Sequence, residues 1–403
     1  MGGIIIVGAG QAGASLAAKL RTLRYEGELT LIGEEPAPPY QRPPLSKGYL
    51  LGAVTLERLY LRPHSFWNKQ GVTLRLGVPV TAINSAQRTV MLDGDTITYD
   101  QLAITTGARP RHLPPVARCD LTGIYVVRTL ADVDAMAPEF RAGRRLLVIG
   151  GGYIGLEVAS VGAKLSLDVT IVESAPRILQ RVAAAETSDY FRRLHASHGV
   201  RILEDTNLLH FVGEGRVSGA VLSDGSEINV DFVIVAIGIV PNTLLAEVAG
   251  LEVDIGVRTD EYGRTSDPNI WAAGDCASFP YRGGRIRLES VGNAIDHAEL
   301  VAENMYGHDK RSYHAKPWFW SDQYDVKLQI AGLNAGYDRI VTRKGEGNVV
   351  SFWYYRADEL LAVDAMNDTR AYMVAKRLIE LGRSPDPATI TNASTDLKLL
   401  IKG

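Results

Sequence analysis

The feature that most constrains the fold is a glycine fingerprint that occurs twice in the chain. Residues 8–13 read GAGQAG after the apolar run 3–7, and residues 150–155 read GGGYIG after the apolar run 146–149. Glycines at this spacing let a buried strand turn tightly into a helix whose first amides face a pyrophosphate. Each copy therefore predicts a strand, a turn and a helix that bind a dinucleotide, with these glycines at the phosphates: Gly8, Gly10 and Gly13, and Gly150, Gly152 and Gly155.

An acidic residue follows each fingerprint at the distance that ribose binding requires. Glu34 lies 21 residues after Gly13, and Glu173 lies 18 residues after Gly155. A carboxylate roughly 20 residues past the last glycine can accept hydrogen bonds from ribose hydroxyls. The alternative is that each is an ordinary surface glutamate at the end of a strand. Two complete units in one chain favour the binding of two dinucleotides.

Length and charge exclude several other classes. A chain of 403 residues is long for one core, so two or three domains are expected. The net charge is −3 and no stretch carries a sustained basic run, which gives no reason to propose a nucleic-acid partner. No stretch has the length of a membrane span, and the apolar start lacks a basic leader. We therefore expect a cytoplasmic protein without a membrane partner.

The two cysteines, Cys119 and Cys276, lie far apart in the sequence. Without a close pair, the chain is not expected to hold a redox-active dithiol, a zinc ion or an iron–sulfur cluster, so no metal site is predicted. We expect Cys276, in an apolar segment, to be a buried and inert thiol.

The order of motifs indicates an α/β protein with duplicated modules. Residues 102–110 and 233–241 are both apolar strands followed by glycine and then proline, so the two modules share an ending as well as a beginning. A strand at 269–273 leads to Asp275, and a helix is expected from Val291 to Met305. Beyond Pro317 the pattern predicts a separate α+β domain, with strands at 327–332, 339–342, 349–355 and 360–365 and a helix at 369–381.

Five segments give the chain a family resemblance. They are residues 40–47 (YQRPPLSK), 150–157 (GGGYIGLE), 265–268 (TSDP), 273–277 (AGDCA) and 318–323 (WFWSDQ). In these the chain resembles the FAD-dependent NADH:ferredoxin reductases, the family of putidaredoxin reductase and of the reductase components of aromatic-ring dioxygenases. The resemblance implies a glutathione-reductase-like fold with two Rossmann-like domains. It places FAD on a discontinuous domain (1–112 and 241–317), NAD on residues 113–240, and a C-terminal α+β domain at 318–403.

The same resemblance implies which residues contact FAD. They are Ala12, Glu34, Arg42, Lys47, Val80, Arg128, Asp275 and Val291, with Trp320 beside the flavin ring. Asp275 can accept hydrogen bonds from ribityl hydroxyls, although it can also cap a helix. A helix that begins at Val291 would direct its positive end at the flavin edge that gains negative charge, or would simply pack at an interface. Val80 is otherwise a core valine, and at least one of Trp318, Phe319 and Trp320 is expected to belong to the domain core.

Lys47 and Glu157, together with Trp320, are the predicted catalytic residues. Lys47 follows two prolines that stiffen its backbone, and Glu157 lies in the first turns of the second fingerprint helix. A lysine cation near a flavin makes the ring a better hydride acceptor, and a carboxylate partner holds that cation. The alternative is an exposed salt bridge that contributes little.

The absence of a cysteine before Cys119 shapes the predicted mechanism. Related disulfide reductases use a thiol relay there, so in this chain FAD would take hydride from NADH and pass single electrons to a 2Fe–2S ferredoxin that serves an oxygenase. Glu173 would repel a 2′-phosphate and favours NADH, although Arg177 could soften that preference. We expect an acidic ferredoxin, with a docking face or merely a solvated surface at Lys310, Arg311, Lys316, Arg339, Arg343 and Lys344.

Two alternatives remain open on the sequence alone. Enzymes of the same fold include NADH oxidases and nitrite- or rubredoxin-linked reductases, and the fold does not separate them. A flavoprotein that signals through its redox state, resembling apoptosis-inducing factor, would belong to a different functional class.

Overall fold

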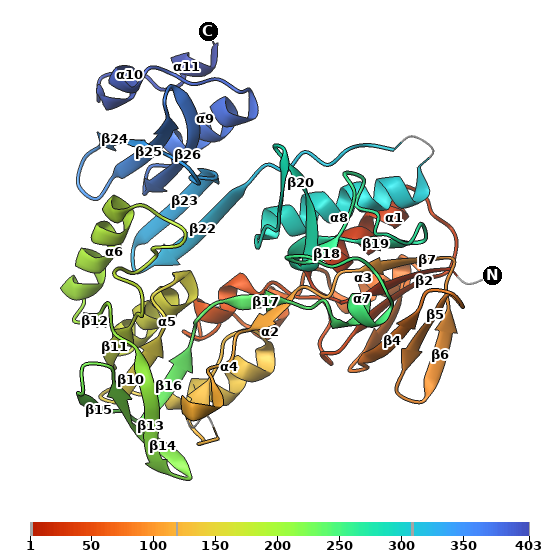
Figure 1. The fold of residues 1–403 in the computed structure, drawn as a ribbon, viewed down its shortest axis with the longest axis horizontal. Coiled ribbons are helices and arrows are strands. Elements are labelled where there is room, and N and C mark those ends of the chain that lie inside the picture. Colours follow the sequence, from red (N-terminus) through yellow and green to blue (C-terminus); the bar gives the residue numbers. More distant parts are fainter. Residues whose placement is uncertain (1–2, 118–119, 308–309, 403) are drawn as a thin grey trace. The chain divides into compact units, whose positions relative to one another are not determined.

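The computed structural model describes residues 3–117, 120–307 and 310–402, and Figure 1 shows their fold. By their internal contacts the residues divide into two compact units, each discontinuous in sequence. The first unit contains Met1–Arg42, Thr55–Arg109 and Ile239–Pro317. The second contains Pro43–Val54, Pro110–Gly238 and Trp318–Gly403.

The first unit is built on a five-stranded parallel sheet of order β19-β7-β1-β2-β3. Ile4 and Ile6 join the apolar cluster under helices α1 and α8, whereas Ile5 and Val7 join the cluster on the opposite face. A strand buried on both faces needs a continuous apolar run, which is what the sequence supplies there. The elements are β1 (Ile4–Val7), α1 (Gln11–Thr22), β2 (Leu29–Gly33), β3 (Thr73–Leu76), β7 (Gln101–Ile104), β19 (Ile270–Ala272) and α8 (Val291–Tyr306).

Helix α8 confirms the predicted start at Val291. Ser290 caps it, because its hydroxyl oxygen accepts a hydrogen bond from the Asn293 amide at 3.2 Å. The remaining elements of this unit are α2 (Leu56–Leu59), α3 (His64–Lys69), the antiparallel sheet β4 (Val80–Asn84), β5 (Thr89–Leu92) and β6 (Asp95–Thr98), helix α7 (Leu244–Val248), and the sheet β18 (Val257–Arg258), β20 (Ala277–Tyr281) and β21 (Gly284–Ile286). Strands β8 (Ala108–Pro110) and β17 (Ile239–Pro241) pair where the chain passes from one unit to the other.

The second unit contains a parallel sheet of order β12-β11-β10-β16-β9, which repeats the plan of the first. In each sheet the strand before the glycine fingerprint is central, with the acid-bearing strand beside it. The duplication predicted from the paired motifs is therefore confirmed. The elements are β9 (Ile124–Tyr125), α4 (Leu130–Met136), β10 (Arg145–Ile149), α5 (Tyr153–Lys164), β11 (Asp168–Val172), α6 (Ala185–Ser197), β12 (Arg201–Leu203), β13 (Leu208–Glu214), β14 (Arg216–Leu222), β15 (Glu227–Asn229) and β16 (Phe232–Val235).

The C-terminal part of the second unit is an antiparallel sheet of order β22-β23-β26-β25-β24 with helix α9 against one face. This is the predicted α+β domain. The segment WFWSDQ, which was not singled out as a strand, forms the edge strand β22. The elements are β22 (Trp318–Gln323), β23 (Val326–Gly332), β24 (Arg339–Lys344), β25 (Val350–Arg356), β26 (Glu359–Met366), α9 (Thr369–Glu380), α10 (Pro387–Thr391) and α11 (Leu399–Lys402).

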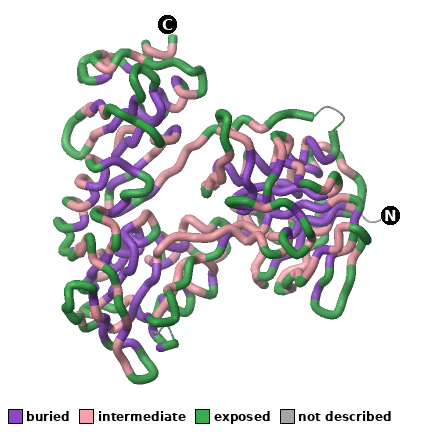
Figure 2. Tube along the Cα trace, in the orientation of Figure 1, coloured by how far each residue is buried: buried purple, intermediate pink, exposed green. Residues whose placement is uncertain are grey.

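Burial follows this plan, since the buried segments run along the sheet strands and the helix faces that cover them (Figure 2). Among the described residues, we find no helix with both the length and the apolar character needed to cross a membrane.

Candidate functional site

The first glycine fingerprint forms a cradle between β1 and α1. Gly8 has a φ of +113°, and a Cβ there would lie 2.3 Å from the Thr105 carbonyl oxygen. A Cβ on Gly13 would lie 2.0 Å from the Gly8 carbonyl oxygen, so the fold itself requires both glycines. At Gly10, the N-cap of α1, a Cβ would meet nothing within 4 Å. That space beside the helix N-terminus fits a pyrophosphate.

The second fingerprint repeats this geometry between β10 and α5. A Cβ on Gly150 would lie 2.5 Å from the Ala236 carbonyl oxygen, and one on Gly155 would lie 2.1 Å from the Gly150 carbonyl oxygen. Gly152, the N-cap of α5, again faces open space. In both copies the outer glycines are needed for packing, whereas the middle glycine clears room for something other than protein. The two sites therefore fit two dinucleotides.

The two acids lie at the ends of the strands next to their fingerprints. Glu34 follows β2 and is exposed. Glu173 follows β11, and its carboxylate accepts hydrogen bonds from the Gly151 amide at 2.7 Å and from the Ala175 amide at 2.8 Å. Those bonds hold Glu173 against its glycine turn. Arg177 is engaged elsewhere, because its guanidinium donates to the Ser188 hydroxyl at 2.6 Å.

Other residues expected at FAD lie at several places in the first unit. Asp275 is in the short turn Gly274–Cys276 after β19, and Val291 opens α8. A Cβ on Gly274 would lie 2.9 Å from the Ala12 Cβ, so this turn and the start of α1 are in close contact. Arg42 forms an ion pair with Glu35 at 2.6 Å.

Val80 and Arg128 belong to different units. Val80 begins β4 and packs against the apolar cluster that contains Ile83 and Val90. Arg128 belongs to the second unit, where its amide donates to the Asp132 carboxylate at 3.1 Å just before α4.

The structure brings Lys47 and Glu157 together inside the second unit. The Lys47 ammonium lies 2.7 Å from Glu157 Oε2, and the two side chains are 17% and 1% exposed. Lys47 directly follows the 3₁₀ turn Pro43–Ser46, and its ammonium also donates to the Pro43 carbonyl at 3.2 Å. An exposed salt bridge contributes little, but this one is buried, and removing one partner would leave the other charge uncompensated.

Two hydroxyls complete the surroundings of Glu157, and sequence reasoning missed both. Ser46 Oγ donates to Glu157 Oε2 at 2.5 Å, and Ser321 Oγ donates to Oε1 at 2.7 Å. Each serine lies within a segment that carried the family resemblance. Nothing in the sequence, however, connects Ser321 with a glutamate 164 residues earlier.

Trp320 lies on β22, directly before Ser321. Trp318 and Trp320 share one face of this strand, with ring centroids 5.6 Å apart, whereas Phe319 on the other face lies 4.7 Å from the Tyr153 ring of α5. Trp318 packs against the core of the C-terminal domain, as expected for at least one of these aromatic residues. Trp320 is half-buried.

The thiols and the basic residues give two further outcomes. Cys276 is buried, as expected, and burial raises the pKa of its thiol; Cys119 lies outside the described residues. Within the described part of the chain, no group of histidine, cysteine and acidic residues could hold a metal ion.

Two of the basic residues expected to form a docking face also contact other parts of the fold. The Arg343 guanidinium donates to the carbonyls of four residues: Ile390, Asn392, Ala393 and Thr395. Lys310 donates to the Asn304 carbonyl and lies 5.1 Å from the centre of the Trp271 ring. Four bonds engage the half-buried Arg343 within the fold, whereas Lys310 is exposed despite its contacts. Lys316 and Lys344 are exposed.

Comparison with known proteins places this geometry among redox enzymes. The family model for pyridine nucleotide-disulphide oxidoreductases matches residues 2–298, and a model for a reductase C-terminal domain matches residues 318–401. The chain is 41% identical to rhodocoxin reductase of Rhodococcus erythropolis, over 99% of this chain and 94% of that protein. It is 43% identical to a ferredoxin–NAD(P)(+) reductase of Sphingomonas sp, over 94% and 92% of the two chains. A crystal structure of the covalent putidaredoxin reductase–putidaredoxin complex superposes with a TM-score of 0.96 at 39% identity, covering 100% of this chain and 98% of that one.

Proposed function

The chain belongs to the pyridine nucleotide-disulphide oxidoreductase family, and from that premise we propose that it is an FAD-dependent NADH:ferredoxin reductase. The acceptor would be a 2Fe–2S ferredoxin that serves a monooxygenase or dioxygenase. The observation that carries the proposal is the buried Lys47–Glu157 pair in a chain with two dinucleotide cradles. The names of the similar proteins, which include a ferredoxin reductase and a complex with putidaredoxin, support a small redox protein as acceptor.

We propose that the duplicated modules divide the two nucleotides between them. The cradle at Gly8, Gly10 and Gly13 would hold FAD, with Glu34 at its ribose and Ala12, Asp275 and the start of α8 nearby. The cradle at Gly150, Gly152 and Gly155 would hold NADH, with Glu173 at its ribose. This assigns residues 1–112 and 241–317 to FAD, 113–240 to NADH and 318–403 to the C-terminal domain.

When bound, FAD supplies an acceptor for the hydride of NADH that can release the two electrons one at a time. The chain contributes charge and position. Glu157 fixes the Lys47 ammonium at 2.7 Å in a mostly buried place, where charges are less screened than in water. The helix end at Val291 contributes a partial positive charge, and Trp320 contributes a flat aromatic surface.

Glu173 is the basis for a preference for NADH. Its two oxygens are held by backbone amides, so the carboxylate stays where a 2′-phosphate would meet negative charge. Arg177 is turned toward Ser188, which weakens the case that it relieves this repulsion. Steady-state kinetics with both nucleotides tests the assignment, and a preference for NADPH would contradict it.

We propose an acidic ferredoxin as partner and the cytoplasm as location. With Arg343 engaged within the fold, the exposed residues Lys310, Lys316 and Lys344 are the better candidates for docking. The unpaired, buried Cys276 is consistent with a reducing compartment.

The test uses purified protein reconstituted with FAD. We expect NADH to reduce the flavin and electrons to reach cytochrome c only when a 2Fe–2S ferredoxin is present. Ferredoxin reduction should slow with added salt while reduction of a small dye does not. Fast oxygen consumption without ferredoxin would instead identify an oxidase. Slow turnover with a redox-dependent change of oligomer would identify a signalling flavoprotein.

A further inference from the structure

A series of hydrogen bonds between buried polar side chains, called here the hydrogen-bond chain, extends from Glu157 toward the surface of the second unit. Ser321 Oγ donates to Glu157 Oε1 at 2.7 Å, and Gln323 Nε2 donates to Ser321 Oγ at 3.2 Å. Gln323 Oε1 then lies 2.8 Å from Nε2 of His195 on α6. Ser321, Gln323 and His195 are each 0% exposed. Each of these polar groups therefore depends on its neighbours in the chain for hydrogen bonds.

The donor and acceptor atoms give this hydrogen-bond chain one direction. Gln323 Oε1 can only accept, so His195 Nε2 carries the proton, and His195 Nδ1 accepts from the Tyr324 hydroxyl 3.2 Å away. Burial lowers the pKa of His195 to about 4, which keeps the ring neutral at neutral pH. From Tyr324 inward, every donor points toward Glu157.

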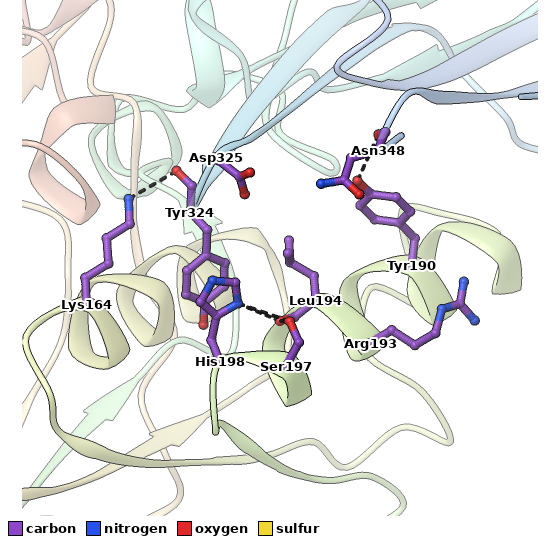
Figure 3. A pocket seen from close by; sticks show the side chains of 9 residues that line it. All are labelled: Lys164, Tyr190, Arg193, Leu194, Ser197, His198, Tyr324, Asp325 and Asn348. Carbon is purple, nitrogen blue, oxygen red and sulfur yellow. Dashed lines mark hydrogen bonds between the residues drawn. The ribbon is translucent and has the colours of Figure 1, made fainter. Parts of the chain in front are cut away.

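The outer end of the chain is at the surface. Tyr324 lies at the hairpin turn between β22 and β23 with a φ of +56°, a left-handed conformation that is uncommon for a tyrosine. Its ring stacks on His198 with centroids 3.7 Å apart, and its carbonyl accepts from Lys164 at 3.1 Å. Figure 3 shows these side chains around a surface pocket of about 630 Å³.

We propose that His195, Gln323 and Ser321 are positioning residues for hydride transfer, a role that rests on the proposed function of the Lys47–Glu157 pair. They hold the Glu157 carboxylate through Oε1, the oxygen that Ser46 and Lys47 do not bind. They also fix β22, because Phe319, Ser321 and Gln323 share one strand face, and anchoring that face sets the place of Trp320 on the other. A fully satisfied buried network favours a single arrangement, since any other leaves polar groups unpaired.

The test compares three variants of the FAD-loaded enzyme. His195→Phe keeps the ring but removes both nitrogens, whereas His195→Gln retains an amide donor for Gln323. Thr187→Val is the matched control. Thr187 lies eight residues earlier on the same helix and donates to Asp364 at 2.7 Å. It therefore links α6 to the C-terminal sheet but is not part of the hydrogen-bond chain to Glu157.

Stopped-flow reduction by NADH should separate these variants. We expect His195→Phe to lower the limiting rate of flavin reduction by roughly 10- to 100-fold with little change in the apparent Kd for NADH, because misplaced groups cost rate rather than binding. His195→Gln should recover most of the rate, and Thr187→Val should keep it. If Thr187→Val lost as much rate as His195→Phe, general loosening of the domain contact would explain both, and the proposal would be wrong.

A second readout does not depend on activity. Side-chain ¹⁵N NMR of the wild-type protein should show His195 as the neutral tautomer with its proton on Nε2. A proton on Nδ1 would overturn the direction of the chain, even in a protein that fails to reduce any ferredoxin. Conversely, an Nε2–H tautomer in a protein that NADH does not reduce would support the direction of the hydrogen-bond chain and refute the proposed function.

Discussion

Replacing Gly152 or Gly155 by alanine should separate nucleotide binding from folding. Gly152 has extended backbone angles (φ −80°, ψ −179°) that alanine adopts without strain, and no atom lies within 4 Å of its added methyl group. At Gly155 the methyl would lie 2.1 Å from the Gly150 carbonyl oxygen, far inside contact distance. The first change should therefore affect the ligand, and the second should affect the fold.

The magnitudes follow from these distances. For Gly152→Ala, a weaker helix cap costs about 0.5–1 kcal/mol of stability. Alanine also lowers the conformational entropy of the unfolded chain, which stabilises the protein by about 0.4–1 kcal/mol, so stability should hardly change. The added methyl group fills the space of the phosphate and displaces it from the helix amides. Loss of one hydrogen bond to the charged phosphate in this way costs about 1.5–3 kcal/mol, or roughly a ten- to hundredfold rise in KM for NADH. For Gly155→Ala, overpacking against backbone costs about 1–3 kcal/mol or more, which lowers Tm by about 2–12 °C.

Thermal unfolding and NADH kinetics on the two variants provide the assay. The first fingerprint supplies a parallel pair, since Gly10→Ala should lower FAD content without unfolding the protein, whereas Gly13→Ala should destabilise it. If Gly152→Ala left the KM for NADH unchanged, the open space at that glycine would not be a phosphate site. If it reduced FAD content instead, the assignment of the two cradles would be reversed.

Three further predictions address other parts of the chain. Glu173→Gln should raise the kcat/KM for NADPH relative to NADH by about tenfold because it removes the charge that repels a 2′-phosphate, and an unchanged ratio would contradict this. Burial raises the pKa of Asp364 to about 6, so the folded state retains a proton that the unfolded chain releases, and stability falls as pH rises from about 4 to 6. Relative to Asp364→Asn, wild type should lose about 3 kcal/mol across that window in denaturation measurements, and equal pH dependence would be inconsistent with it. Arg343→Ala should expose residues 390–395 to proteolysis without altering the salt dependence of ferredoxin reduction, whereas a changed salt dependence would return Arg343 to the docking surface.

The Lys47–Glu157 pair shows how far sequence reasoning reaches. Lys47 and Glu157 were paired through the family resemblance, and the structure gives that pair its distance and burial. The four other polar residues around them, Ser46, Ser321, Gln323 and His195, could not be found in this way. They come from three segments far apart in the chain, and a serine or glutamine carries no spacing signal that identifies its partner.

The basic residues show the opposite case, in which sequence reasoning grouped residues that the fold uses separately. Lys310, Arg343 and their neighbours cluster in the sequence, but a charge in a sequence does not reveal whether carbonyls surround it. Arg343 holds the segment that follows α10, and Lys310 lies against Trp271. Only the folded backbone determines which cations remain available to a partner.

The sequence by itself determined the features that depend on local geometry: two strand–glycine–helix turns, an acid after each, and the helix that begins at Val291. Neighbouring residues fix these, because backbone sterics and hydrophobic period act over short distances. Tertiary structure alone decided what surrounds Glu157 and left open space at the middle glycine of each fingerprint. The surroundings of Glu157 depend on contacts between residues more than a hundred positions apart, which packing establishes and no local pattern encodes.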